Sequence, residues 1–194
     1  MNFQESIELL IRDMDEKKIR DTMNKVERAK ATTIKWSKLP SDGFLPFKVI
    51  LSGLKPDCLV DKISSKINAF EYHYDDESNL LLIKSHDRKG NVERQEYIDR
   101  NDNISVVVDN YGSVRSKCKI AFDDKKRLAE GIYIDDCVRI HYLYNYEGDL
   151  ISSIVVRSSQ NGYIETTLFV ERNDLEVVNL YYFFNEKKMY LINQ

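Results

Sequence analysis

Residues 70–86 read FEYHYDDESNLLLIKSH, and the pattern in this stretch recurs to the end of the chain. An aromatic residue, Tyr74, is followed by a polar turn and then by an aliphatic residue, Leu80, six positions on. Polar turns between short apolar runs are typical of antiparallel hairpins. The same spacing, starting from an aromatic or aliphatic residue, joins Ile98 to Ile104, Phe122 to Leu128, Tyr144 to Leu150, Phe169 to Leu175 and Phe183 to Met189.

The composition changes near residue 70, because all three prolines precede it and all twelve tyrosines follow it. Aromatic residues pack well across strands, whereas proline removes a donor from the ladder. Turn-like pairs separate the apolar runs, and Asn161-Gly162 is the strongest of them because it suits a type I′ hairpin. We predict strands near residues 70–75, 80–86, 92–98, 104–109, 114–122, 128–134, 137–145, 150–158, 163–170, 175–184 and 189–193.

Residues 3 to about 35 are predicted to be helical, with Asn2 as the N-cap. One apolar stripe runs from Phe3 to Met14 and a second from Ile19 to Ile34, and the polar run 15–18 separates them. This break is consistent with two helices joined by a tight turn or with one bent helix.

The connection to the hairpins contains two further predicted elements. Phe47–Leu51 is predicted to be a short strand. Pro56 suits the first turn of a helix, whose apolar side would be formed by Leu59, Val60, Ile63 and Ile67.

These elements predict an α+β fold that is mostly β. About eleven strands are too many for one flat sheet, so we expect a long antiparallel β-meander that forms a curled sheet or a partly closed barrel. The run 80–83 is apolar on both faces and therefore needs cover on both. We expect residues 1–69, an N-terminal helical region with one strand, to pack on the meander of residues 70–194 as one cooperative domain.

The composition limits the class of protein. The 194 residues carry a formal net charge of −3, with 42% hydrophobic and 31% charged residues, which is typical of a folded globular domain. There is no apolar run of membrane-spanning length and no secretory signal pattern at the N-terminus. Cys58, Cys118 and Cys137 show no pairing or zinc-site spacing. We therefore expect a cytoplasmic protein without a membrane partner.

The sequence contains no recognisable catalytic or metal-binding motif. His73, His86 and His141 do not have the spacing of a metal site, and we expect structural or surface roles for them. The seven glycines form neither a phosphate-binding loop nor a nucleophile elbow. We expect no catalytic residues, no metal and no cofactor.

The repeated pattern resembles the YD-repeat (Rhs-type) family. Tyr74-Asp75 followed by Leu80, and Phe122-Asp123 followed by Leu128, match its Tyr-Asp, turn and Leu unit, whereas Phe169-Val170 departs from it. The large members resemble shells that enclose toxins, and this chain is too short for that role. Small, acidic β-rich proteins are similar to the immunity proteins of bacterial polymorphic toxin systems. The resemblance therefore implies a protein-binding module that neutralises a partner toxin.

Alternate turns of a meander lie along one edge of its sheet, and here this edge is rich in carboxylates. An acidic edge would attract a basic partner such as a toxin domain, because complementary charge speeds association. The candidate partner-binding residues are Asp75, Asp76, Glu77, Asp99, Asp102, Glu147 and Asp149.

The alternative interaction surface is the basic stretch Lys17–Lys38, which carries eight basic and two acidic residues. A basic amphipathic helix can bind nucleic acid or another anionic surface. The candidate residues of this basic patch are Lys17, Lys18, Lys25, Arg28, Lys30 and Lys35.

Overall fold

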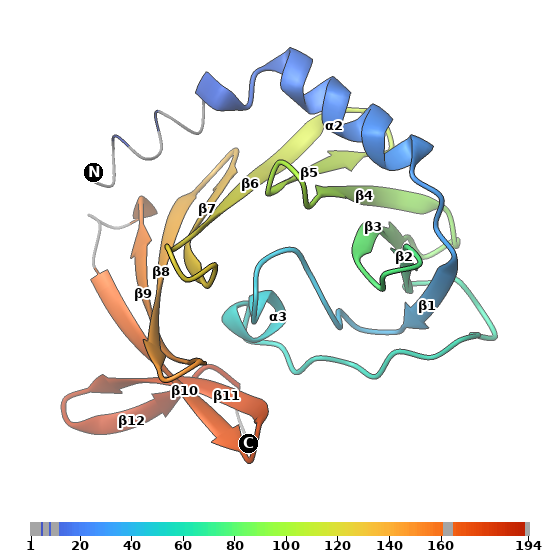
Figure 1. Cartoon of the computed structure of the whole chain (residues 1–194). Helices are drawn as coiled ribbons and strands as arrows, with labels where there is room; N and C mark the ends of the chain where they lie inside the picture. Colours follow the sequence, from blue (N-terminus) through green and yellow to red (C-terminus); the bar gives the residue numbers. More distant parts are fainter. Residues whose placement is uncertain (1–4, 6–7, 9–11, 161–164, 193–194) are drawn as a thin grey trace.

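The computed structural model describes residues 5, 8, 12–160 and 165–192. These residues form one 12-stranded antiparallel sheet in which every strand pairs with its neighbours in sequence, as predicted. The sheet curls into an open arc and does not close into a barrel (Figure 1). The strands are β1 (Thr33–Ser37), β2 (Phe70–Tyr74), β3 (Leu80–His86), β4 (Val92–Asp99), β5 (Ile104–Asp109), β6 (Val114–Phe122), β7 (Leu128–Asp135), β8 (Arg139–Glu147), β9 (Leu150–Ser158), β10 (Glu165–Asn173), β11 (Glu176–Phe184) and β12 (Lys187–Tyr190).

Four of the hairpin turns share one construction that begins with an aspartate. Asp75, Asp87, Asp109 and Asp123 each accept the backbone N–H groups two and four residues further on, at 2.8–3.0 Å. These bonds favour the charged carboxylate and lower the pKa of all four groups. The aspartate at the start of each turn therefore has a structural role, because its side chain stabilises the turn backbone.

The fourth residue of each of these turns has a left-handed backbone. The φ angle is 64° at Ser78, 81° at Gly90, 80° at Gly112 and 60° at Lys126. A three-residue loop with this geometry creates a β-bulge, and the strand register shifts beside each of the four turns. Bulges bend a strand and increase its twist, so the repeated turns favour a curled sheet.

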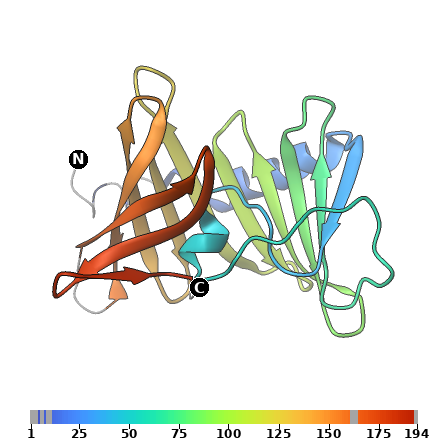
Figure 2. The ribbon, with the colours of Figure 1, turned by 90° about the horizontal axis from the view of Figure 1, so that it is seen from below.

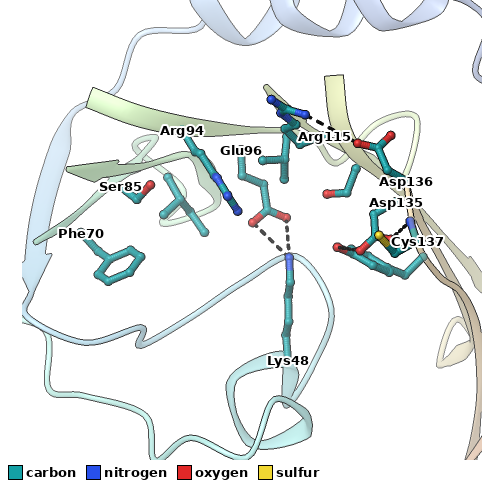
Figure 3. A pocket seen from close by; sticks show the side chains of 13 residues that line it. Lys48, Phe70, Ser85, Arg94, Glu96, Arg115, Asp135, Asp136 and Cys137 are labelled. Carbon is teal, nitrogen blue, oxygen red and sulfur yellow. Dashed lines mark hydrogen bonds and ion pairs between the residues drawn. The ribbon is translucent and has the colours of Figure 1, made fainter. Parts of the chain in front are cut away.

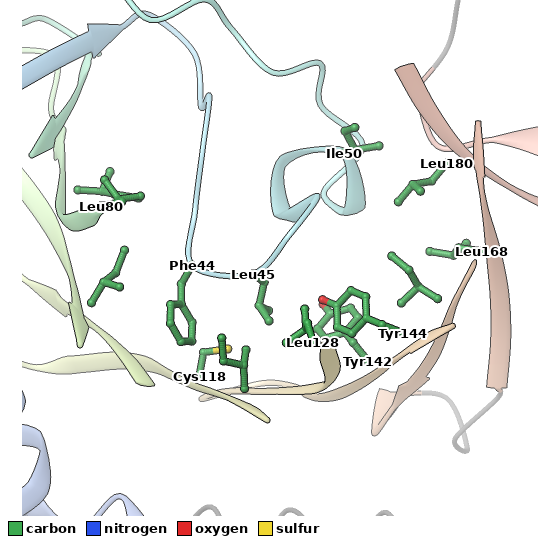
Figure 4. Close-up of a cluster of buried hydrophobic side chains, with 14 of the residues drawn as sticks. Phe44, Leu45, Ile50, Leu80, Cys118, Leu128, Tyr142, Tyr144, Leu168 and Leu180 are labelled. Carbon is green, nitrogen blue, oxygen red and sulfur yellow. The ribbon is translucent and has the colours of Figure 1, made fainter. Parts of the chain in front are cut away.

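The concave face is filled by the chain between β1 and β2. Residues 38–60, the inserted segment, contain the short helix α3 (Lys48–Leu51) and lie between the two halves of the sheet (Figure 2). Phe44, Leu45 and Ile50 are buried there against residues of β3 and β6–β11 (Figure 4). Leu45 lies so close to the sheet that a Cβ atom at Gly131 would be 2.6 Å from its Cδ2 atom.

Helix α2 (Glu16–Arg28), whose first turn is capped by the Asp15 side chain, covers the part of the convex face around β4 and β5 (Figure 1). Met14 and the helix residues Ile19 and Val26 pack on the outward-facing side chains of β4, β5 and β7, including Tyr97 and Val106. The apolar run 80–83 of β3 thus gains cover on both faces, because Leu80 and Ile83 pack in the concave core and Leu81 and Leu82 pack against the cluster under α2.

Three predicted elements are wrong, all before residue 70. Residues 33–37 form β1 rather than helix, because they pair with β2 along its whole length. Phe47–Leu51 is not a strand, since Phe47 has a left-handed backbone and α3 follows it inside the concave face. The segment after Pro56 is not helical, and its Val60 instead forms an isolated antiparallel bridge with Trp36 of β1.

The long N-terminal helix was predicted only in part. Met14 and Asp15 interrupt the helical conformation, which agrees with the break between the two apolar stripes. Helix α2 then ends at Arg28, earlier than expected. The proposed N-cap Asn2, most of the first stripe and the Asn161-Gly162 turn lie outside the described residues.

The aspartate turns lead to a direct test by thermal unfolding. Substitution Asp87→Ala removes the acceptor for the Lys89 and Asn91 amides, so we expect Tm to fall by roughly 3 °C. Asp87→Asn keeps a side-chain oxygen that can form the same turn and should restore most of the loss. The exposed Asp76→Ala serves as the matched control, and equal Tm values for the two alanine variants would contradict a capping role.

Candidate functional site

The predicted acidic edge is only partly available to a partner. Asp75 caps a turn, and Asp99 is 5% exposed and accepts the amides of Asn101 and Asp102. By contrast, Asp76 and Glu77 are exposed on the β2–β3 turn. On the same edge of the meander, Glu147 and Asp149 are exposed at the β8–β9 turn.

Asp99 and Asp102 hold helix α2 on the sheet. The Nζ atom of Lys25 lies 3.0 Å from Asp99 Oδ2, and the Nζ atom of Lys18 lies 2.7 Å from Asp102 Oδ2. Lys25 also pairs with Asp102, and these contacts lower the pKa of Asp102 and raise that of Lys25. Two candidates from the acidic edge and two from the basic patch therefore neutralise each other.

The rest of the basic patch divides in the same way. Lys35 forms an ion pair with Asp61 of the connection between β1 and β2. Lys17, Arg28 and Lys30 are exposed, and none of them pairs with an acidic group among the described residues. Three of the six predicted residues of the basic patch are therefore exposed and form no ion pair with a described residue.

The C-terminal half of α2 and the β2–β3 turn line a cleft of about 520 Å³, which we call the edge cleft. Arg28 and Lys25 come from the helix, Asp76 and Glu77 from the turn, and Arg100 from the next turn on this edge. The two surfaces predicted as alternatives thus meet at one place.

A second cleft, of about 600 Å³, opens on the concave face and is called the concave cleft (Figure 3). Lys48 of α3 projects into it towards Glu96 of β4, with Nζ 3.4 Å from Oε2 and 3.5 Å from Oε1. Glu96 Oε1 also accepts the Ser105 hydroxyl at 3.0 Å. No local pattern in the sequence marks this pair, because only the insertion of α3 brings Lys48 to β4.

Two ionisable groups at or near the concave cleft, Lys48 and Cys118, have shifted pKa values. Burial, the largest single effect, would lower the pKa of Lys48, but the charge and hydrogen bond of Glu96 together with Cys118 and Tyr133 raise it, so the ammonium stays protonated. Burial also raises the pKa of the nearby Cys118 thiol. Neither group is therefore an activated nucleophile at neutral pH.

The outer face of β2 and β3 carries a cluster of ionisable groups around Glu71. His73 Nε2 lies 2.6 Å from Glu71 Oε1, and His86 Nε2 lies 3.2 Å from Oε2. Burial alone would raise the pKa of Glu71, but the contacts with His73, Lys84 and His86 lower it to about 2. His86 Nδ1 lies 3.1 Å from the Gly90 carbonyl oxygen, so each ring nitrogen of His86 faces an oxygen atom.

All three histidines lie in strands of the sheet: His73 in β2, His86 in β3 and His141 in β8. The rings of His73, His86 and His141 each contact a glutamate side chain. Among the described residues, no group of three or more His, Cys, Asp or Glu side chains could hold a metal ion. No helix in the described part of the chain has both the length and the apolar character needed to cross a membrane.

Comparison with known proteins gives no assignment. None of the protein-family models matches this chain, and a search of curated proteins finds no match.

The Glu71 cluster leads to a pH-dependent prediction. Because the pKa of Glu71 is depressed from 4.5 to about 2, its contribution to stability is fully present above pH 4.5 and is lost as the pH falls through about 2. We expect Glu71→Gln to lower the free energy of unfolding by about 2 to 3 kcal/mol at pH 7. Urea unfolding from pH 7 to pH 2 should show the difference from the unmodified protein shrinking with acid. A difference that stays constant would contradict the role of the charged carboxylate.

Proposed function

We propose that this protein is a protein-binding module of the immunity type, which neutralises a partner toxin by direct binding. The observation that supports this function best is the pair of exposed acids, Asp76 and Glu77, beside the edge cleft. Glu147 and Asp149 add negative charge further along the same edge.

The acidic β2–β3 turn is held in one conformation before any partner arrives. Asp75 accepts the Glu77 and Asn79 amides, and its own amide donates to the Asn79 carbonyl at 3.1 Å. A preorganised turn loses little conformational entropy on binding, which favours affinity. Asp76 and Glu77 are thus displayed on a rigid support.

The proposed partner is a basic protein domain, because exposed acids attract positive charge and speed association. Arg28 and Arg100 at the edge cleft add specificity, since a fully basic surface would be repelled there. A partner that places cations on the β2–β3 turn and an acidic or neutral group near the arginines satisfies both conditions.

Nucleic acid is the alternative partner, and the exposed Lys17, Arg28 and Lys30 are the residues that support it. Phosphate binding depends on the number of cations that reach the backbone. The ion pairs of Lys18, Lys25 and Lys35 reduce the positive charge that this face can offer.

The test uses the product of the gene adjacent to the one that encodes this protein. We expect the product of the adjacent gene to be toxic when it is expressed alone and harmless when it is co-expressed with this protein. We also expect the two purified proteins to bind each other. Asp76→Lys should lower the association rate constant roughly threefold at low salt, measured by stopped-flow fluorescence, because the substitution weakens electrostatic steering. Glu93→Lys is the matched control, since Glu93 is exposed at the start of β4, towards the opposite edge of the meander.

Two outcomes would contradict the proposal. Equal association rates for Asp76→Lys and Glu93→Lys would exclude the β2–β3 turn as the steering surface. Tight duplex RNA or DNA binding that falls steeply with salt, and is lost when Lys17, Arg28 and Lys30 are reversed to Glu, would favour the nucleic-acid alternative.

A further inference from the structure

The concave cleft separates charge along its length (Figure 3). Arg94 lies on one side of the Lys48–Glu96 pair, and Asp135 and Asp136 lie on the other. A ligand that spans the cleft therefore meets Arg94 at one end and, at the other, two carboxylates with Arg115 beside Asp136.

The Arg94 end carries excess positive charge. Among the described residues that line the cleft, Glu96 is the only carboxylate at this end, beside Arg94 and Lys48. Glu96 already binds Lys48 and accepts the Ser105 hydroxyl. Arg94 is exposed and makes no ion pair with a described residue. Its guanidinium group can bind a carboxylate through two parallel hydrogen bonds, so this end suits an anion.

The opposite end carries excess negative charge. Asp135 accepts the amides of Cys137 and Val138 and the Tyr133 hydroxyl, which fixes its orientation. The side chain of Asp136 is 72% exposed, and its one ion pair with a described residue is to Arg115 at 3.6 Å. Arg115 lies closer to Asp109, at 2.8 Å, so Asp136 remains able to bind an ammonium group.

Apolar side chains lie among these charged groups. Phe70, Ile83 and Val107 line the cleft from β2, β3 and β5. Small-molecule sites usually combine an apolar lining with a few placed polar groups that fix the ligand's orientation. Methylene groups between the two charges of a ligand would pack on these three side chains.

We propose that the concave cleft binds a small zwitterion whose carboxylate and ammonium groups are joined by a short apolar chain. The carboxylate binds Arg94 and the free N–H groups of Lys48, and the ammonium binds Asp136 and Asp135. This site lies on the concave face, separate from the acidic β2–β3 turn, and is independent of the proposed toxin partner.

The test is an NMR titration of the full ¹⁵N-labelled chain with three matched probes. 6-Aminohexanoate carries both charges, hexanoate only the carboxylate and hexylamine only the ammonium group. We expect 6-aminohexanoate to bind about tenfold more tightly than either single-charge probe. The saturable amide shifts should lie at Ser85, Glu96 and Ser116, which line the cleft from β3, β4 and β6.

Single substitutions test which side chain binds the carboxylate of the ligand and which binds its ammonium group. Arg94→Gln should abolish the advantage of 6-aminohexanoate over hexylamine, and Asp136→Asn should abolish its advantage over hexanoate. Arg88→Gln, an exposed change in the β3–β4 turn outside the cleft, should leave all three affinities unchanged. The spectrum of each free variant checks that the fold is intact.

Three results would overturn the proposal. These are equal affinity for the three probes, shifts confined to residues outside the cleft, and an Arg94→Gln variant that binds 6-aminohexanoate as tightly as Arg88→Gln does.

Discussion

The hydrogen bonds from the turn amides to the first aspartate of a turn are the constraint on which the architecture depends. At Asp75, Asp87, Asp109 and Asp123 they stabilise the same loop, and each loop adds a bulge to the sheet. Repeated bulges curl the meander, and the curl creates a concave face that needs apolar cover. The inserted segment supplies this cover, and its Lys48 completes the concave cleft.

The meander could be predicted because its signals are local. Apolar runs of strand length, separated by turn residues, are encoded within a few positions, and the strands after residue 70 follow them. The failures before residue 70 have long-range causes. Thr33–Ser37 becomes a strand because β2 offers a free edge. Lys48–Leu51 forms a helix because the inserted segment packs on the concave face, where the neighbouring Leu45 contacts the sheet at Gly131. Tertiary packing decides both conformations.

The candidate sites also combine features that the local sequence predicts with features that depend on long-range packing. The excess of acids at the turns was visible in the sequence, but the roles of individual carboxylates were not. Asp99 and Asp102 hold α2, whereas Asp76 and Glu77 stay exposed, and only the path of α2 distinguishes them. Lys48 and Glu96 are 48 positions apart in sequence, so no local motif signals their pairing.

The curl of the sheet requires that the inserted segment fill the concave face, and amide hydrogen exchange, followed residue by residue by NMR, tests this requirement most directly. If the inserted segment is an integral part of the core, the amides of Leu51 and Gly53, which donate to the Phe47 and Ile50 carbonyls, exchange only through global unfolding. We expect them to show the same opening free energy as the amides of β6 to β8. Much faster exchange of Leu51 and Gly53 than of these strands would show that the segment detaches from an intact sheet, which would contradict a single cooperative core.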